Sequence, residues 1–305
     1  MKKIDISTEA GGLKLKNPVM PASGTWGYGE EYAEFYNPGE LGAVVVKGTT
    51  VEPRHGNEPP RIAETPAGML NSVGLQNVGI EKFISEKLPF LKDNKCVVIA
   101  NIAGGSIDDY AAIAERLDAE KDVSAVEVNI SCPNVSKGGI AFGVRADTAS
   151  GVIKSVRKKY KRVLIAKLSP NVTDIVEIAR ACIDSGADAL TLINTVKGMS
   201  IDINNRKPLL PNCTGGLSGP AIKPIALRMV YEVKKATGAD IIGVGGIECF
   251  EDALEFIMAG ASAVQVGTAN FYNPFIMPEI IDGFGKYLAE NSISSVKELI
   301  GVAIR

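Results

Sequence analysis

The sequence predicts one α/β domain, residues 1–305, built as a closed (β/α)8 TIM barrel. Eight short apolar runs recur along the chain, and amphipathic segments separate most of them. Buried strands that alternate with helices indicate parallel pairing with the helices outside. Eight units favour a closed barrel over an open doubly wound sheet of five or six. The predicted strands are 18–21, 43–46, 97–100, 125–128, 163–166, 189–193, 240–244 and 263–266.

Helical spacing of apolar residues places helices in most of the connecting segments, and several of these end at glycine. The predicted helices are 80–91, 107–118, 148–160, 174–185, 221–236 and 250–259. Before the first unit, 4–7 and 13–16 alternate in polarity around Gly11 and Gly12, which predicts a hairpin capping the lower mouth of the barrel. Connections 49–79 and 195–219 exceed the usual length, so we interpret them as binding loops at the upper face.

The composition describes an ordinary globular protein. A hydrophobic content of 46%, a charged content of 22% and a formal net charge of −2 argue against nucleic acid as a partner. The N-terminus lacks the apolar segment of a signal peptide, and no apolar run approaches the roughly 20 residues of a membrane span, so we expect a cytoplasmic protein. Five scattered cysteines predict free thiols and neither a disulfide framework nor a metal site.

The chain contains one histidine, His55, in the polar, proline-rich segment 52–60. Histidine-based triads, two-histidine metal sites and most hydrolase mechanisms would have to work with this residue alone, and a place in a mobile surface loop is the favoured interpretation of His55. Proton transfer in any catalytic site must use another side chain. Cys132 is a candidate, because it lies on the loop at the carboxyl end of the predicted β-branched strand 124–130, which Pro133 cannot continue. An inert, buried cysteine is the rival reading.

Polar residues and glycines end the predicted strands, and two of these residues are lysines, whose burial requires an anionic or electron-rich partner. Glycines after the seventh and eighth strands lie where barrels hold phosphate on backbone N–H groups. Lys47 and Lys167 could each form a Schiff base, pair with a carboxylate or stabilise a reduced cofactor ring. The strand-end set is Ser23, Lys47, Asn101, Asn129, Cys132, Lys167, Asn194, Thr195, Gly245, Gly246, Gly267 and Thr268.

Asparagine side chains both donate and accept hydrogen bonds, which suits a ligand ring with alternating C=O and N–H groups. Asn71, Asn129, Asn134 and Asn194 are the candidates, although each could simply occupy a turn.

Several motifs together resemble the dihydroorotate dehydrogenase family over nearly the whole chain. They are PASG at 21–24, KGTT at 47–50, NSVGLQN at 71–77, NISCPN at 129–134 and GVGGI at 243–247. In this family the cytosolic class 1 enzymes carry cysteine as the catalytic base, and the membrane-associated class carries serine at that position. With Cys132 at this position, the chain resembles class 1. KGTT and RHGNEPPR at 54–61 resemble the class 1B, NAD-linked catalytic subunit.

The resemblance implies an FMN-containing barrel that oxidises dihydroorotate to orotate in pyrimidine synthesis. Cys132 would take the C5 proton while hydride leaves C6 for flavin N5, and the loop 131–143 would exclude water. The implied substrate contacts are Lys47, Asn71, Ser72, Val73, Gly74, Leu75, Asn129, Asn134, Asn194 and Thr195. The implied FMN contacts are Ser23, Lys47, Gly48, Asn101, Asn129, Lys167, Ile193, Gly219, Gly245, Gly246, Gly267 and Thr268, the last four at the phosphate.

In the class 1B type, electrons pass to NAD through a separate subunit that carries FAD and a [2Fe-2S] cluster. The five dispersed cysteines of this chain do not form a cluster-binding run, so the resemblance implies a heterotetramer around a catalytic homodimer. Two alternatives stay open. One is the partner-free, fumarate-dependent class 1A homodimer. The other is a flavin-free barrel lyase or synthase in which Lys167 forms a Schiff base and the glycine loops hold substrate phosphate.

Overall fold

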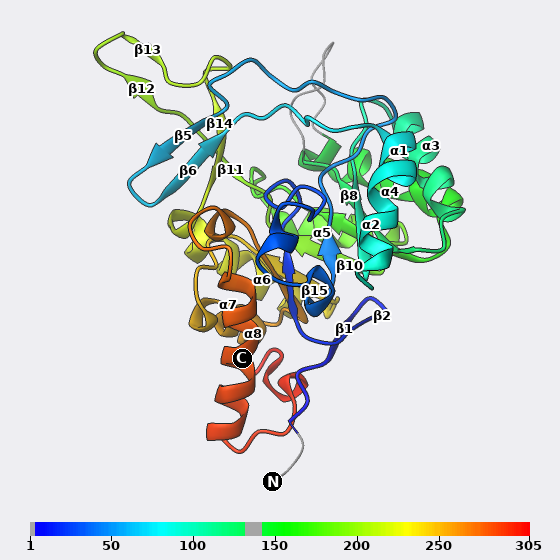
Figure 1. Ribbon diagram of the computed structural model, residues 1–305, viewed down its shortest axis with the longest axis vertical. Helices are drawn as coiled ribbons and strands as arrows, with labels where there is room; N and C mark the ends of the chain where they lie inside the picture. Colours follow the sequence, from blue (N-terminus) through cyan, green and yellow to red (C-terminus); the bar gives the residue numbers. More distant parts are fainter. Residues whose placement is uncertain (1–3, 132–141) are drawn as a thin grey trace.

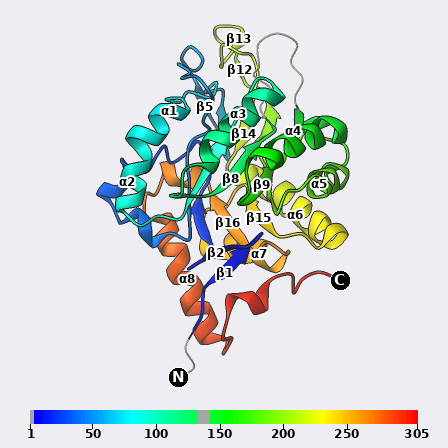
Figure 2. The ribbon, with the colours of Figure 1, turned by 90° about the vertical axis from the view of Figure 1, so that its right-hand side faces the viewer.

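A computed structural model describes residues 4–131 and 142–305 and shows a nearly closed barrel of eight parallel strands surrounded by helices (Figures 1 and 2). The strand order β3-β16-β15-β10-β9-β8-β7-β4 follows the chain around the barrel. The strands are β3 (Val19–Pro21), β4 (Val44–Val45), β7 (Val98–Ile102), β8 (Val123–Asn129), β9 (Val163–Lys167), β10 (Ala189–Leu192), β15 (Ile241–Val244) and β16 (Ala263–Val266).

The seam between the first and second barrel strands, β3 and β4, is joined by one backbone hydrogen bond, from Gly42 N–H to the Val19 carbonyl (2.9 Å). A Cβ at position 42 would lie 2.1 Å from the Asn17 carbonyl oxygen, so only glycine permits this close approach. The predicted (β/α)8 barrel is confirmed.

The helices pack around the outside of the sheet, and most follow the predicted segments. They are α1 (Ile80–Lys82), α2 (Leu88–Asp93), α3 (Ile107–Asp118), α4 (Ala146–Lys159), α5 (Ile175–Asp184), α6 (Lys223–Thr237), α7 (Phe250–Met258) and α8 (Ile276–Glu290). A π-helical turn, η3 (Phe83–Lys87), joins α1 to α2, where the sequence predicted one helix. Helix α8 was not predicted. Short 3-10 turns are η1 (Tyr32–Glu34), η2 (Pro38–Glu40), η4 (Phe142–Val144), η5 (Pro220–Ile222), η6 (Thr268–Phe271) and η7 (Val296–Leu299).

The N-terminal hairpin lies at the amino ends of the barrel strands, as predicted, but its first strand was misplaced. Strand β1 (Thr8–Ala10), not 4–7, pairs with β2 (Leu13–Leu15) across a two-residue turn. Gly11 and Gly12 have positive φ, and this tight turn begins the pairing at the residue directly before it. Ala10 and Leu15 are buried against the lowest inward-facing layer of the barrel.

The two long connections are not simple loops, which corrects the sequence interpretation. They supply an antiparallel sheet of order β11-β14-β6-β5 and a small hairpin, at the end of the barrel opposite β1 and β2 (Figure 1). Backbone pairing between the two connections therefore joins them into one cover over this end of the barrel. The strands are β5 (Ile62–Thr65), β6 (Gly68–Asn71), β11 (Val196–Gly198), β14 (Gly215–Ser218) and the hairpin strands β12 (Ile201–Asp202) and β13 (Lys207–Pro208).

The barrel interior is layered. Side chains two residues apart on a strand share a face, so each inward-facing residue near a strand's start is followed by another one layer higher. The lower layer is apolar and includes Ile99, Ala125, Ile165, Ala189 and Ala263. The next layer is polar and consists of Asn101, Glu127, Lys167, Thr191 and Gln265, all buried.

In the part of the chain that is described, no helix is both long and apolar enough to cross a membrane.

Candidate functional site

The polar layer forms one hydrogen-bonded network beneath the upper mouth. Glu127 Oε1 accepts from Asn101 Nδ2 (2.7 Å), and Glu127 Oε2 accepts from Thr191 Oγ1 and Gln265 Nε2 (2.7 Å each). Lys167 Nζ lies 3.7 Å from Glu127 Oε1 and donates to Ser23 Oγ (3.1 Å) and Gln265 Oε1 (3.4 Å). The predicted residues Ser23, Asn101 and Lys167 thus meet around a carboxylate that was not predicted.

Asn101 carries an unusual feature. Its Oδ1 atom is buried and has no hydrogen-bond partner among the described residues. A Cβ at position 48 would lie 2.9 Å from this oxygen, so Gly48 keeps the space beside it open. Buried acceptors normally find a donor, so this oxygen indicates a ligand N–H or O–H.

Lys47 lies at the mouth and is partly buried. Burial lowers the pKa of its ammonium, the Arg61 charge lowers it further, and Glu31 opposes them. No carboxylate of the described residues lies within ion-pair distance of Lys47. A partly desolvated cation of this kind suits an anionic ligand group.

Asn129 ends β8 and Asn194 follows β10, and their side chains meet at the mouth across β9. Asn194 Nδ2 donates to Asn129 Oδ1 (3.3 Å), which also accepts from Ser131 N–H (3.1 Å). Tyr110 of helix α3 fixes this strand end from behind, because its hydroxyl donates to the Asn129 carbonyl (2.8 Å). The two amides are thereby held in place, as recognition of a polar ring requires.

The segment 71–75 reaches the same mouth from strand β6. Asn71 Nδ2 donates to the Gly216 carbonyl (3.1 Å), and buried Ser72 accepts from Asn57 and Asn212. A Cβ at position 48 would lie 3.4 Å from Leu75 Cδ2, which places Leu75 beside the end of β4.

Other predicted members of this region are placed by the same cover. Val73 accepts a backbone hydrogen bond from Asn57 N–H (3.0 Å), and a Cβ at Gly74 would lie 2.7 Å from the Asn57 nitrogen. Thr195 faces Gly216, where a Cβ would collide with the threonine side chain. The predicted substrate segment therefore folds over the upper end of the barrel.

The glycines of the predicted phosphate turn lie close to one another and to the start of α6. Gly219 precedes η5 and α6, and a Cβ at Gly246 would lie 2.8 Å from the Gly219 carbonyl and 2.9 Å from Lys223 N. Gly246 has φ +74°, which favours glycine. A Cβ at Gly245 would lie 3.5 Å from Ile193 Cγ1. The glycines thus leave bare backbone beside the N-terminus of a 15-residue helix, an arrangement that favours anions.

At the end of β16, Gly267 is followed by buried Thr268, whose hydroxyl donates to Ser218 Oγ (2.8 Å). This bond ties the eighth strand end to the cover strand β14. Of the predicted site residues, Cys132 and Asn134 lie outside the described residues. The others surround the upper end of the barrel.

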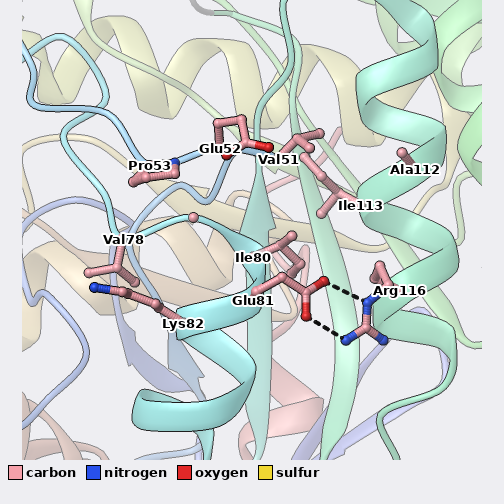
Figure 3. A pocket seen from close by; sticks show the side chains of 11 residues that line it. Val51, Glu52, Pro53, Val78, Ile80, Glu81, Lys82, Ala112, Ile113 and Arg116 are labelled. Atoms are coloured by element: carbon pink, nitrogen blue, oxygen red, sulfur yellow. Dashed lines mark hydrogen bonds and ion pairs between the residues drawn. The ribbon is translucent and has the colours of Figure 1, made fainter.

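Sequence reasoning missed Glu127, Thr191 and Gln265, since it considered only the last residue or two of each strand. The signal was available, because a glutamate in a strand as apolar as 123–129 must face a polar partner. The position of the surface cavity does not identify this site either, because none of the predicted site residues lines it. A cavity of about 280 Å³ lies outside the barrel between 51–53, α1 and α3, with a Glu81–Arg116 ion pair (2.8 Å) at its edge (Figure 3).

These features define a (β/α)8 protein that gathers polar side chains and glycine turns at the carboxyl ends of its strands, the end where barrels of this kind carry their ligand sites. A profile of the family described as dihydroorotate dehydrogenase matches residues 5–288. The chain belongs to the dihydroorotate dehydrogenase family.

Similar proteins extend the comparison. The chain is 55% identical over 304 residues, 100% of both chains, to the "Dihydroorotate dehydrogenase B (NAD(+)), catalytic subunit" of Geotalea uraniireducens. Proteins of the same name are 56% identical in Geotalea daltonii (99% of both chains) and 53% identical in Bacteroides thetaiotaomicron (97% of this chain and 98% of the relative).

Proposed function

We propose that this chain oxidises dihydroorotate to orotate in pyrimidine biosynthesis, using bound FMN. Family membership and full-length relatives named as catalytic subunits support an oxidoreductase of this reaction and weigh against the Schiff-base lyase alternative. The observation within the chain that carries the proposal is the upper mouth of the barrel. There the polar layer holds a buried lysine and an amide oxygen that has no hydrogen-bond partner among the described residues, and a glycine turn lies at the same end of the barrel.

The residues of this mouth fit FMN. Asn101 Oδ1 could accept from a ring N–H, and Lys167 would supply a positive charge to a reduced, anionic ring bound at this mouth. The glycine backbone beside α6 suits the phosphate. When bound, FMN supplies hydride acceptance at N5. The residues that would hold it are Ser23, Lys47, Gly48, Asn101, Asn129, Lys167, Ile193, Gly219, Gly245, Gly246, Gly267 and Thr268.

We assign the substrate to the same mouth. Lys47 would bind the carboxylate of dihydroorotate, since its ammonium has no carboxylate partner within ion-pair distance among the described residues. Asn129, Asn194 and Thr195, with Asn134, would bind the alternating C=O and N–H groups of the ring. The segment 71–75, from Asn71 through Ser72, Val73 and Gly74 to Leu75, would cover it.

We assign Cys132 as the base that takes the C5 proton. Burial raises the pKa of three other thiols, those of Cys96 and Cys249 to about 11 and that of Cys182 to about 12, which disfavours a thiolate at any of them. A free thiol has a pKa of about 8.5, so we expect the rate to rise toward alkaline pH.

Cysteine substitution tests this assignment. Cys132→Ser should retain FMN, and rapid mixing with dihydroorotate without oxygen should show flavin reduction at least 100-fold slower at neutral pH, in the range that general bases contribute. Cys213→Ser is the matched control, because Cys213 is exposed and lies in a different segment. Equal rates for Cys132→Ser and the control would remove Cys132 from this role.

For the assembly, we propose one catalytic domain per chain and a homodimer of this chain. A partner subunit that contains FAD and a [2Fe-2S] cluster would pass the electrons to NAD, giving a cytoplasmic heterotetramer. The relatives' words "catalytic subunit" support a second subunit. Exposed aromatic side chains of Phe35, Phe271, Tyr272 and Phe275 provide apolar surface of the kind that subunit contacts bury.

Electron acceptors test the assembly. The chain mixed with its partner subunit should reduce NAD+ with dihydroorotate, and the chain alone should not. Turnover with fumarate by the isolated chain at a rate comparable to its best acceptor would instead indicate the class 1A homodimer.

A further inference from the structure

Glu127 is the most buried charged residue in the polar layer, and its surroundings are unusual for a carboxylate. Its side chain is 0% exposed and that of Lys167 is 5% exposed, the least exposed ion pair among the described residues. Three direct hydrogen bonds of 2.7 Å, from Asn101, Thr191 and Gln265, converge on its two oxygens. A buried carboxylate needs such partners, so this network is a built feature of the barrel.

All three hydrogen bonds are donated to Glu127. An ionised carboxylate only accepts hydrogen bonds, so each amide beside Glu127 must turn its NH2 group inward. Asn101 does so through Nδ2, which leaves Oδ1 on the other side, next to Gly48. Gln265 does so through Nε2, and its Oε1 then accepts from Lys167. One side chain thereby fixes the orientation of two amides.

The same carboxylate holds the lysine. Lys167 Nζ is bracketed by Ser23 Oγ, Gln265 Oε1 and Glu127 Oε1, at 3.1, 3.4 and 3.7 Å. Two of these three neighbours are Glu127 or a group that Glu127 orients. The position of the ammonium at the mouth therefore depends on Glu127 both directly and through Gln265.

We propose that Glu127 is a positioning residue of the flavin site, which aims Asn101 Oδ1 at the ligand and holds the Lys167 ammonium beside Ser23. This inference rests on the proposed function, because it takes FMN as the occupant of the mouth. The negative charge of Glu127 also offsets part of the positive charge of Lys167. Glu127 therefore sets how strongly the site favours a reduced, anionic ring.

Glu127→Gln tests the proposal, because glutamine keeps the shape but offers one acceptor and one NH2 group. A donor then faces a donor, and Asn101 or Gln265 must rotate. We expect FMN binding to the apoprotein, measured by flavin fluorescence, to weaken at least tenfold. We expect the midpoint potential of bound FMN to rise, by a tenfold change in the reduction equilibrium, or about 30 mV for two electrons.

Three further variants separate positioning from simple loss of structure. Lys167→Met should shift the potential in the opposite direction, downward, because it removes the positive charge. Asp188→Asn is the matched control: Asp188 pairs with Arg157 (2.8 Å) and accepts from Leu164 N–H at the other end of the barrel. The Asp188→Asn variant should keep both the affinity for FMN and the equilibrium constant for FMN reduction within twofold of wild type. In an Asn101→Ala background, Glu127→Gln should weaken FMN by threefold at most.

The outcomes are distinct. Wild-type protein that binds no FMN would refute the proposed function. Wild-type protein that binds FMN, with Glu127→Gln equal to it in affinity and potential, would refute only this inference. If Glu127→Gln does not fold, Glu127→Asp decides: affinity weakened at least threefold with the potential retained supports the proposal, and unchanged affinity overturns it.

Discussion

Lys47 offers the sharpest perturbation of the substrate site. Its ammonium is partly buried, its pKa is lowered by burial, and no described carboxylate lies within ion-pair distance. A bound substrate carboxylate would supply that partner in a charge-assisted hydrogen bond, which contributes about 1.5–3 kcal/mol. Lys47→Met should therefore lower kcat/KM for dihydroorotate by about 10- to 150-fold, at 1.36 kcal/mol per tenfold.

The assay is steady-state oxidation of dihydroorotate by wild type and Lys47→Met, with Lys197→Met as control. Lys197 is exposed on strand β11, so its removal changes the charge of the cover without removing the proposed contact. A kcat/KM for Lys47→Met within twofold of the control would refute the assignment.

The lowered pKa of Lys47 fixes the sign of a pH dependence. The folded protein releases this proton at lower pH than the unfolded chain, so between the two pKa values the unfolded state binds more protons and stability rises with pH. Over the same window the cation is lost, so KM for the anionic substrate should increase. Denaturant unfolding and KM measured from pH 8 to 10 should both lose this dependence in Lys47→Met.

Further predictions concern the glycine turn and the support of Asn129. Gly246→Ala should destabilise the fold by about 1–3 kcal/mol and weaken FMN binding. Residue 246 has φ +74°, which strains alanine, and the new Cβ would clash with the Gly219 carbonyl oxygen. Gly285→Ala should raise the free energy of unfolding, measured by urea titration, by about 0.5–1 kcal/mol. Gly285 lies in helix α8, and a Cβ there would have nothing within 4 Å. Tyr110→Phe should cost about 1 kcal/mol, because it removes the hydroxyl bonded to the Asn129 carbonyl. Loss of stability in Gly285→Ala, or none in Tyr110→Phe or Gly246→Ala, would contradict these estimates.

The barrel was predictable because its strands are buried on both faces, which leaves continuous apolar runs that the sequence displays directly. The strand ends were predictable for the same reason, since each run stops at a polar residue or glycine. Lys167 and Asn101 were thereby found, and the structure joins both through Glu127.

The remaining features depend on contacts between distant segments. Strand β14 pairs with β6, more than 140 residues earlier in the chain, and its Gly215 and Gly216 give no local strand signal. Glu127 was overlooked because it lies two residues before the strand end. The alternation of side chains that places it under Asn129 was the clue.

The most direct test of the account is an anaerobic titration of the purified chain with dihydroorotate, followed by visible absorbance. We predict a flavin spectrum from one FMN per chain that bleaches with one equivalent of dihydroorotate. Bound flavin that stays oxidised would contradict the assigned substrate, and a colourless protein that cannot be reconstituted with FMN would contradict the cofactor itself.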